Sequence, residues 1–181
     1  MNLPNKLTLA RFLMIPVFLV IVSTGWRYNN YLAAAVFLLG AVTDGLDGYI
    51  ARKRGQVTLA GKLMDPLADK VLVAAALIAL VELERLPGWI AVVIISREFA
   101  VTGLRATAAA GGVIVPASRL GKFKMIAQAI AIVALFVNSL PFSFERPAFS
   151  TIAVAAALVL TVWSGFDYFL KTWQQLVAEK K

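Results

Sequence analysis

The chain of 181 residues contains no cysteine and no histidine. The absence of cysteine excludes disulfide bonds, thiolate metal ligands and thiol nucleophiles. Because histidine is also missing, any bound metal ion must be held by oxygen ligands, which favours Mg²⁺, Mn²⁺ or Ca²⁺ over zinc. A general base that works near neutral pH must then be a carboxylate, a lysine or a tyrosine.

Charged residues are also scarce, at 15% of the chain, whereas 60% of the residues are hydrophobic and the mean hydropathy is +0.80. This composition is typical of an integral membrane protein, and at about 20 apolar residues per span the length allows about six helices. No separate soluble domain fits beside them, so we expect a single domain over residues 1–181. In so apolar a chain, the net charge of +8 favours anionic lipid and phosphate substrates over nucleic acid.

Apolar runs predict an all-α membrane bundle of six transmembrane helices, at residues 7–22, 31–51, 62–81, 89–110, 124–140 and 149–170. Lysine and arginine gather in the N-terminal lead, in the connections after the second and fourth helices, and in the C-terminal tail. The other connections contain one arginine each. The positive-inside rule therefore predicts that both termini and the second connection face the cytoplasm.

Four aspartates stand inside or at the edge of these apolar runs, where a carboxylate is costly and usually functional. Asp44 and Asp47 are three residues apart, and Asp65 and Asp69 are four apart, so each pair lies on one face of a helix. Carboxylates that converge at two helix ends suit two hard divalent cations, which can clamp a diphosphate. The pattern indicates phosphoryl-transfer chemistry.

Small residues accompany the aspartates and leave room for a base or a phosphate against helix backbone, namely Gly45, Gly48, Ala51 and Gly61. Arg52 can donate paired hydrogen bonds to phosphate. In the alternative interpretation, the aspartates are helix caps or pair with neighbouring cations, and the glycines serve helix packing. The coordinated spacing of four aspartates favours the metal site.

The aspartate segment reads D-x2-D-G-x2-A-R-x8-G-x3-D-x3-D and resembles, without a departure, the signature of the CDP-alcohol phosphatidyltransferase family. The resemblance implies a six-helix membrane bundle, usually a homodimer, with two divalent cations, which we expect to be Mg²⁺ or Mn²⁺. It also implies that an alcohol attacks the phosphorus attached to diacylglycerol in CDP-diacylglycerol, with CMP leaving. By this likeness the metal ligands are Asp44, Asp47, Asp65 and Asp69, with Asp69 also the general base, and the nucleotide site includes Gly48, Ala51, Arg52 and Gly61.

Cations in the later helices are candidates for selecting the alcohol. Arg97 and Arg105 are eight residues apart, on nearly one helix face, and with Arg119, Lys122 and Lys124 they can form a pocket for the phosphate of a small acceptor. Alternatively, Arg97 pairs with neighbouring Glu98 or reaches lipid headgroups, and the lysines anchor a helix end.

Residues 97–105 and 120–124, together with the segments 2–8, 65–70 and 164–169, resemble bacterial phosphatidylglycerophosphate synthases. The resemblance implies transfer of the phosphatidyl group to glycerol 3-phosphate at the cytoplasmic face of a bacterial inner membrane. It places Asn5 and Thr8 toward the nucleotide, although both residues are about equally well explained as ordinary residues at the start of a helix. It also implies that the acceptor phosphate is held by Arg97, Arg105, Lys122 and Lys124, with Tyr168 as a further candidate.

Two other functions stay open at this point. The same chemistry can serve another acceptor, such as inositol phosphate, serine or phosphatidylglycerol. A divalent-cation transporter is the alternative from another class, since aspartates in membrane helices also mark ion paths. All four aspartates lie near one membrane face, and the outer halves of the second and third helices contain no polar relay, which favours the enzyme.

Overall fold

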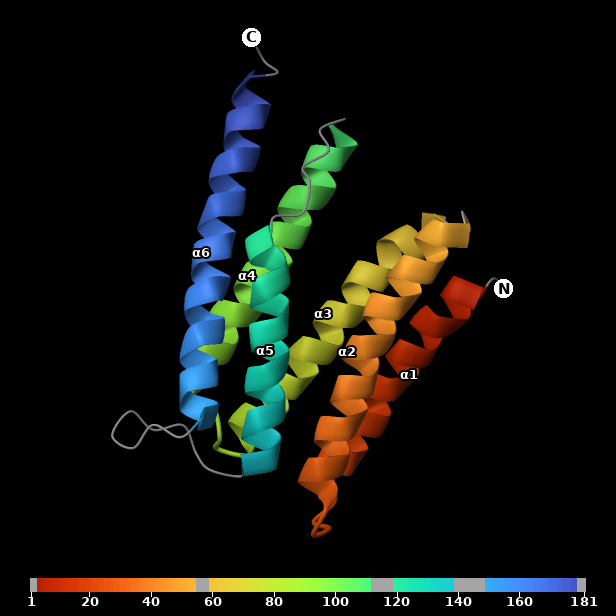
Figure 1. Cartoon of the computed structure of the whole chain (residues 1–181), viewed down its shortest axis with the longest axis vertical. Coiled ribbons are helices and arrows are strands. Elements are labelled where there is room, and N and C mark those ends of the chain that lie inside the picture. Colours follow the sequence, from red (N-terminus) through yellow and green to blue (C-terminus); the bar gives the residue numbers. More distant parts are fainter. Residues whose placement is uncertain (1–2, 55–58, 112–118, 139–148, 179–181) are drawn as a thin grey trace. The chain divides into compact units, whose positions relative to one another are not determined.

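A computed structural model describes residues 3–54, 59–111, 119–138 and 149–178, with side chains over residues 9–43, 67–109, 111, 120–138 and 149–172. This part of the chain forms six helices and no strand (Figure 1). The all-α prediction and the number of helices are therefore confirmed. The helices are α1 (Leu3–Ser23), α2 (Asn29–Arg54), α3 (Leu59–Glu82), α4 (Gly88–Ala110), α5 (Arg119–Asn138) and α6 (Phe149–Ala178).

Five of the six helices begin earlier than the hydropathy pattern predicts, and in α3 and α5 the difference changes where a named residue lies. Helix α5 begins at Arg119 instead of residue 124, so Lys122 and Lys124 lie in its first turns and not in a loop. The physical reason is that lysine, arginine and leucine are good helix formers, and a lone glycine does not end a helix. Helix α3 begins at Leu59, so Pro66 lies beyond the first turn, whereas a helix that began near residue 62 was expected to hold this proline in its first turn. Membrane helices tolerate such prolines because neighbouring groups satisfy the released carbonyl.

The described chain divides into two compact units. The first unit contains Met1–Leu86 and Ile132–Pro141, and the second contains Pro87–Ala131 and Phe142–Lys181. Helix α5 thus contributes its C-terminal part to the first unit and its N-terminal part to the second. A single domain over residues 1–181 stays a prediction.

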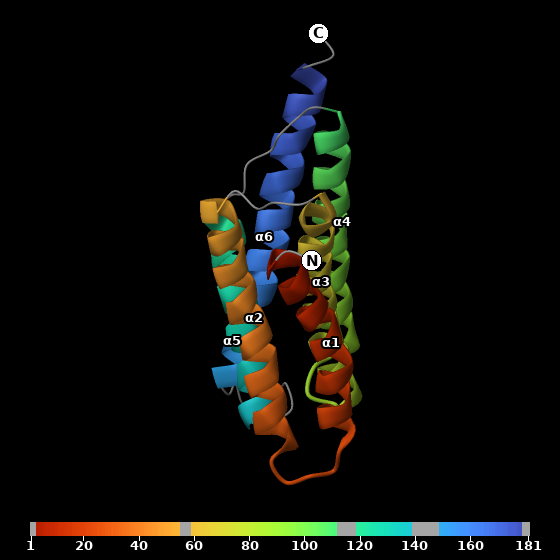
Figure 2. The ribbon, with the colours of Figure 1, turned by 90° about the vertical axis from the view of Figure 1, so that its right-hand side faces the viewer.

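Apolar packing holds the first unit together. Helix α1 contacts both α2 and α3, and α2 also contacts α3 (Figure 2). Phe18 of α1 is fully buried and meets Phe136 of α5 edge to face, with ring centroids 5.7 Å apart. A Cβ added at Gly40 of α2 would lie 2.5 Å from Leu72 Cδ2, so the absence of a side chain lets these helices approach closely.

In the turns of the first unit, the backbone carbonyls near the helix ends accept hydrogen bonds from an asparagine side chain and from a turn with one left-handed residue. Asn29 Nδ2 donates to the Thr24 carbonyl at 2.6 Å, next to the end of α1. At the end of α3, Glu84 has a φ of 57°, while the Arg85 N–H bonds the Leu80 carbonyl and the Glu84 N–H bonds the Val81 carbonyl. This arrangement is a Schellman motif, in which the left-handed position usually belongs to glycine.

Arg85 lies in the connection between α3 and α4 and reaches the last turn of α5. Its Nη1 donates to the carbonyls of Leu135 and Phe136 at 3.4 and 3.3 Å. Those carbonyls have no partner within the helix, and a cation there also complements the helix dipole. Partial burial lowers the pKa of Arg85 from its usual value, but arginine titrates so high that the side chain stays charged at neutral pH.

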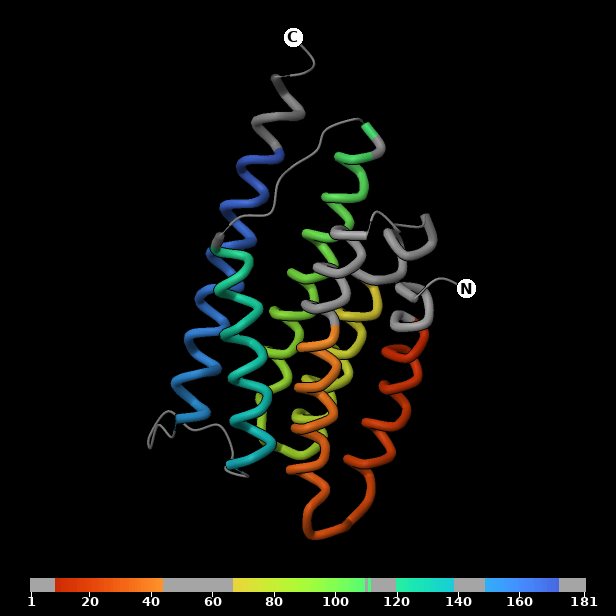
Figure 3. The backbone as a smooth tube through the Cα atoms, turned by 45° about the vertical axis from the view of Figure 1, so that its right-hand side comes forward, coloured from red at the N-terminus to blue at the C-terminus, as the bar shows by residue number. Residues whose placement is uncertain are grey.

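The second unit is built on α4 and α6, which run side by side in the same direction (Figure 3). Arg97 of α4 contacts Thr161 and Ser164 of α6, and Arg105 contacts Tyr168 further along both helices. The N-terminal part of α5 joins them through Lys124 and Gln128. Polar contacts therefore connect all three helices of this unit.

Large apolar side chains are exposed on every one of these helices. Examples are Val20 of α1 at 63%, Leu39 of α2 at 63% and Trp163 of α6 at 67%. Two stretches, Leu120–Asn138 and Phe149–Thr172, are long and apolar enough to cross a membrane, and two shorter apolar helical stretches are Leu9–Ser23 and Asn29–Thr43. An apolar outer surface of this extent suits contact with lipid better than contact with water.

Candidate active site

The aspartate signature occupies two helices of the first unit that are in contact with each other. Asp44 and Asp47 lie in the last part of α2, and Asp65 and Asp69 lie in the first half of α3. The helical spacing on which the prediction depends is therefore present in the backbone. Asp69 is partly buried. Four carboxylates at i, i+3 and i, i+4 on adjacent helices are a donor set that fits hard divalent cations.

Most side chains of the predicted metal and nucleotide sites lie outside the described residues. Among the side chains that the structure describes, no three acidic groups gather into a metal site. Of the four aspartates, Asp69 alone has a described side chain, so the metal site stays a prediction. The undescribed side chains are those of Asn5, Thr8, Asp44, Asp47, Gly48, Ala51, Arg52, Gly61, Asp65 and Arg119.

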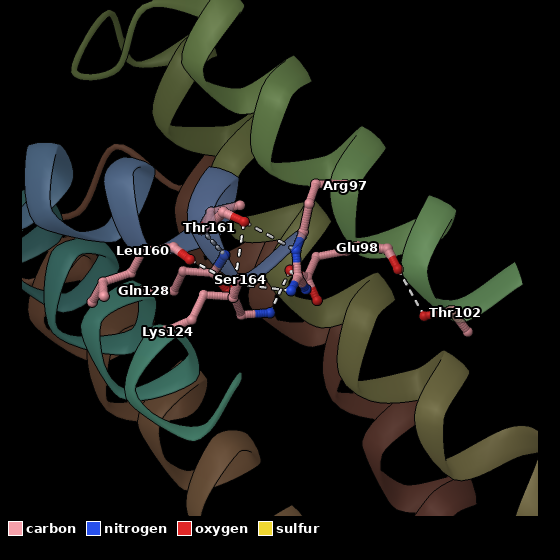
Figure 4. A network of polar contacts seen from close by, with 8 residues as sticks. All are labelled: Arg97, Glu98, Thr102, Lys124, Gln128, Leu160, Thr161 and Ser164. Atoms are coloured by element: carbon pink, nitrogen blue, oxygen red, sulfur yellow. Dashed lines mark hydrogen bonds and ion pairs between the residues drawn. The ribbon is translucent and has the colours of Figure 1, made fainter. Parts of the chain in front are cut away.

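Arg97 is the centre of a polar network in the second unit (Figure 4). Its Nε donates to the Thr161 carbonyl at 3.1 Å, and its Nη2 donates to Ser164 Oγ at 2.9 Å. Its Nη1 pairs with Glu98 Oε1 at 3.2 Å. The alternative interpretation, that Arg97 pairs with neighbouring Glu98, is therefore correct for this contact. Arg97 also reaches from α4 to two positions on α6.

Lys124 of α5 pairs with the same Glu98 oxygen. The lysine side chain is 7% exposed and the Glu98 side chain 12%, so the ion pair is largely removed from solvent. Two cations share one carboxylate, which leaves the group of Arg97, Glu98 and Lys124 with a formal charge of +1. A desolvated positive cluster attracts an anionic ligand such as phosphate more strongly than an exposed lysine does.

Arg105 and Tyr168 form a second pair about two turns further along α4 and α6. Arg105 Nε donates to the Tyr168 hydroxyl at 3.2 Å, and its guanidinium carbon lies 5.1 Å from the centroid of the tyrosine ring. Tyr168 is 4% exposed, whereas Arg105 is exposed. The buried tyrosine therefore orients an arginine that is itself exposed. Lys122 is exposed on α5 and is not part of the Arg97 network.

Sequence reasoning missed three members of this network, namely Gln128, Thr161 and Ser164. Gln128 Nε2 donates to Thr161 Oγ1 at 3.0 Å, and both residues are buried. Ser164 Oγ lies 2.6 Å from the Leu160 carbonyl of its own helix. A signal was available, since Gln128 is an amide in the middle of the apolar run of α5, and buried polar groups in such runs are usually paired.

Comparison with known proteins identifies the class. A sequence model of the CDP-alcohol phosphatidyltransferase family matches residues 1–163. The chain therefore belongs to this family, and the resemblance seen in the aspartate pattern is confirmed.

Three relatives that match nearly the whole chain carry one name. The chain is 46% identical to CDP-diacylglycerol–glycerol-3-phosphate 3-phosphatidyltransferase of Bacillus subtilis (strain 168), with 97% of both chains covered. It is 38% identical to the protein of that name from Rickettsia typhi, covering 93% of this chain and 95% of the relative. It is 37% identical to the one from Pseudomonas fluorescens, covering 97% and 92%.

Proposed function

We propose that the chain transfers the phosphatidyl group of CDP-diacylglycerol to sn-glycerol 3-phosphate, giving phosphatidylglycerol phosphate and CMP. The observation that carries the proposal is the unbroken aspartate signature on α2 and α3. It stands in a chain that is 37–46% identical to relatives named for this reaction. The cations of the second unit supply groups suited to the phosphate of the acceptor.

The reaction makes one bond to phosphorus and breaks another. The acceptor hydroxyl oxygen attacks the phosphorus bonded to diacylglycerol, and the bond from that phosphorus to the bridging oxygen of CDP breaks, so CMP leaves with the electron pair. Asp69 accepts the hydroxyl proton. We assign Asp44, Asp47, Asp65 and Asp69 as ligands of two ions. Bound Mg²⁺ or Mn²⁺ would neutralise the diphosphate and lower the pKa of the hydroxyl.

The remaining predicted residues divide between the two substrates. Gly48, Ala51, Arg52 and Gly61, with Asn5 and Thr8, are proposed for the nucleotide. Arg97, Arg105, Lys122, Lys124 and Arg119, with Tyr168, are proposed for the acceptor. The described contacts support this division, because Arg97 and Lys124 meet at Glu98 and Arg105 is held by Tyr168.

We also propose a six-span protein of the bacterial inner membrane that works as a homodimer with its active site toward the cytoplasm. The exposed apolar side chains on all six helices and the two long apolar stretches support membrane insertion. The basic connections support the orientation. In sealed inverted vesicles, added glycerol 3-phosphate should be consumed, whereas right-side-out vesicles should need permeabilisation.

The decisive experiment measures CMP release by the purified protein with CDP-diacylglycerol and Mg²⁺ or Mn²⁺. Release should require glycerol 3-phosphate and stop on chelation of the metal. Asp69→Asn should lower the rate by at least roughly 1,000-fold, because the variant loses the base and a metal ligand together. Asp167→Asn is the matched control, since among the described side chains Asp167 forms its ion pair with Lys171 of the same helix, α6. Robust turnover by Asp69→Asn would refute the assignment of the base.

An acceptor panel separates this reaction from its alternatives. CMP release with inositol phosphate, serine or phosphatidylglycerol, and not with glycerol 3-phosphate, would keep the chemistry and change the substrate. Divalent-cation flux into protein-containing vesicles without any lipid substrate, combined with no CMP release, would instead support a transporter.

A further inference from the structure

Arg97 is held by contacts to all three of its guanidinium nitrogens. Nε and Nη2 bond to Thr161 and Ser164 of α6, and Nη1 bonds to Glu98 of α4. Contacts from two helices fix the plane of the guanidinium and leave little rotational freedom. Each terminal nitrogen carries two N–H groups, so Nη1 and Nη2 can still donate to an anion in this orientation.

Gly165 provides the space in which the Arg97 side chain crosses α6. A Cβ added at Gly165 would lie 3.0 Å from Arg97 Cγ and 3.2 Å from Arg97 Nε. Both separations are shorter than ordinary van der Waals contact, so an alanine there would displace the arginine stem. Gly103 of α4 makes a useful contrast, since a Cβ at that position would meet nothing within 4 Å.

Ser164, next to Gly165, is a hydrogen-bond partner of Arg97, and its hydroxyl group is held in one orientation. Its Oγ lies 2.6 Å from the Leu160 carbonyl, to which its single proton is donated. Its lone pairs then face Arg97 Nη2 and accept that N–H at 2.9 Å. Because Ser164 is 1% exposed, water cannot replace the bond if the hydroxyl is removed.

The position of Arg97 also affects Lys124 through a shared carboxylate. Glu98 Oε1 bonds both cations, so a shift of Arg97 changes where Glu98 holds the lysine. We propose that Ser164 and Gly165 are positioning residues for the acceptor site, which fix Arg97 and, through Glu98, Lys124 toward the phosphate of the acceptor. This inference rests on the proposed function and adds to it two residues that contact no substrate.

The test compares Gly165→Ala with Gly103→Ala, which makes the same change in open space. We expect Gly165→Ala to raise the KM for glycerol 3-phosphate by roughly tenfold, corresponding to about 1.4 kcal/mol of lost binding. The KM for CDP-diacylglycerol should stay within about twofold, and so should both constants of Gly103→Ala. Ser164→Ala, which adds no atoms, should raise the acceptor KM by about three- to tenfold, and it keeps the test possible if Gly165→Ala folds poorly.

The outcomes distinguish the proposed acceptor from the proposed positioning role of Ser164 and Gly165. If wild-type protein uses another acceptor, the substrate assignment fails, and the KM of that acceptor then tests the positioning role. The inference is overturned if wild-type protein uses glycerol 3-phosphate while Ser164→Ala and Gly165→Ala both match Gly103→Ala. It is also overturned if Ser164→Ala and Gly165→Ala raise the KM for CDP-diacylglycerol as much as the KM for glycerol 3-phosphate. The same holds if the two variants only lower the Tm in a thermal unfolding measurement and leave both KM values unchanged.

Discussion

The side chains that the structure describes as buried differ in kind between the two units of the chain. Among the residues that the structure describes, Arg11 is the one buried polar side chain of the first unit. The second unit buries seven, namely Lys124, Gln128, Ser150, Thr151, Thr161, Ser164 and Thr172. The first unit contains the aspartate signature, and the second contains the described candidates for the acceptor site.

This difference matches two different demands of the proposed function, metal binding by the first unit and phosphate recognition by the second. Metal ligands need helices held at a fixed separation, and close apolar contacts such as Gly40 on Leu72 and Phe18 on Phe136 provide that rigidity. Recognition of an acceptor phosphate needs cations in fixed orientations, which apolar packing cannot give. Hydrogen bonds between α4, α5 and α6 supply them.

Among changes to the packing of the two units, the largest effect should follow from breaking the buried ion pair of the second unit. Lys124→Met removes a cation from the acceptor site and leaves Glu98 short of one partner. We expect kcat/KM for glycerol 3-phosphate to fall by about 100-fold or more, which corresponds to about 2.7 kcal/mol. Steady-state CMP release measures it.

Lys171→Met is the matched control for this prediction. Lys171 pairs with Asp167 on the surface of α6 at 2.8 Å, and its side chain is 58% exposed. Exposed pairs contribute little, so the control should change kcat/KM by less than about twofold. Equal changes of kcat/KM in the two variants would show that the burial of the Lys124–Glu98 pair does not affect activity. The buried polar contacts of the second unit would then have no demonstrated role in acceptor use.

Sequence alone predicted the elements of this fold well because hydropathy marks helices in a membrane protein. All six helices were expected from apolar runs in the sequence, although only two stretches of the described chain are long and apolar enough to cross a membrane. The N-terminal end of α5 was predicted less well, because its basic residues interrupt the apolar pattern without interrupting the helix. Hydropathy indicates which residues contact lipid, whereas helix propensity decides where a helix begins and ends.

The candidate site could be predicted only in part. The aspartates are recognisable because their helical spacing is local in sequence. The Arg97 and Glu98 contact was also foreseeable, because the residues are neighbours. The bonds from Arg97 to Thr161 and Ser164 join residues 64 and 67 positions apart, and they depend on which helix packs beside α4 and in what register. A single sequence does not contain that pairing.

A smaller effect should follow from overfilling the first unit. A Cβ at Gly40 would meet Leu72 Cδ2 at 2.5 Å and Met14 Cε at 3.6 Å, and Leu72 is 1% exposed. Gly40→Ala should therefore lower the free energy of unfolding by about 1–3 kcal/mol, seen as a lower Tm in detergent. The KM for glycerol 3-phosphate should not change. Gly25→Ala, which meets nothing within 4 Å, is the control.

Gly40→Ala and Gly165→Ala together form the sharpest comparison of the units. Both place a methyl group where a neighbouring side chain already lies. The first should change stability without changing acceptor binding, and the second should change acceptor binding. A raised acceptor KM in Gly40→Ala would show that the two interiors do not have separate roles.

The smallest effect should be a gain in stability at the end of α3. Glu84 adopts a φ of 57°, a left-handed conformation that glycine adopts without steric cost. Glu84→Gly should raise the free energy of unfolding by about 1 kcal/mol, measured as a higher Tm, with kcat and both KM values unchanged. Glu82→Gly removes the same charge two residues earlier, inside the helix, and should lower stability by about as much because glycine is a poor helix former. Equal shifts in the two variants would mean that charge, and not backbone conformation, limits the stability of the first unit.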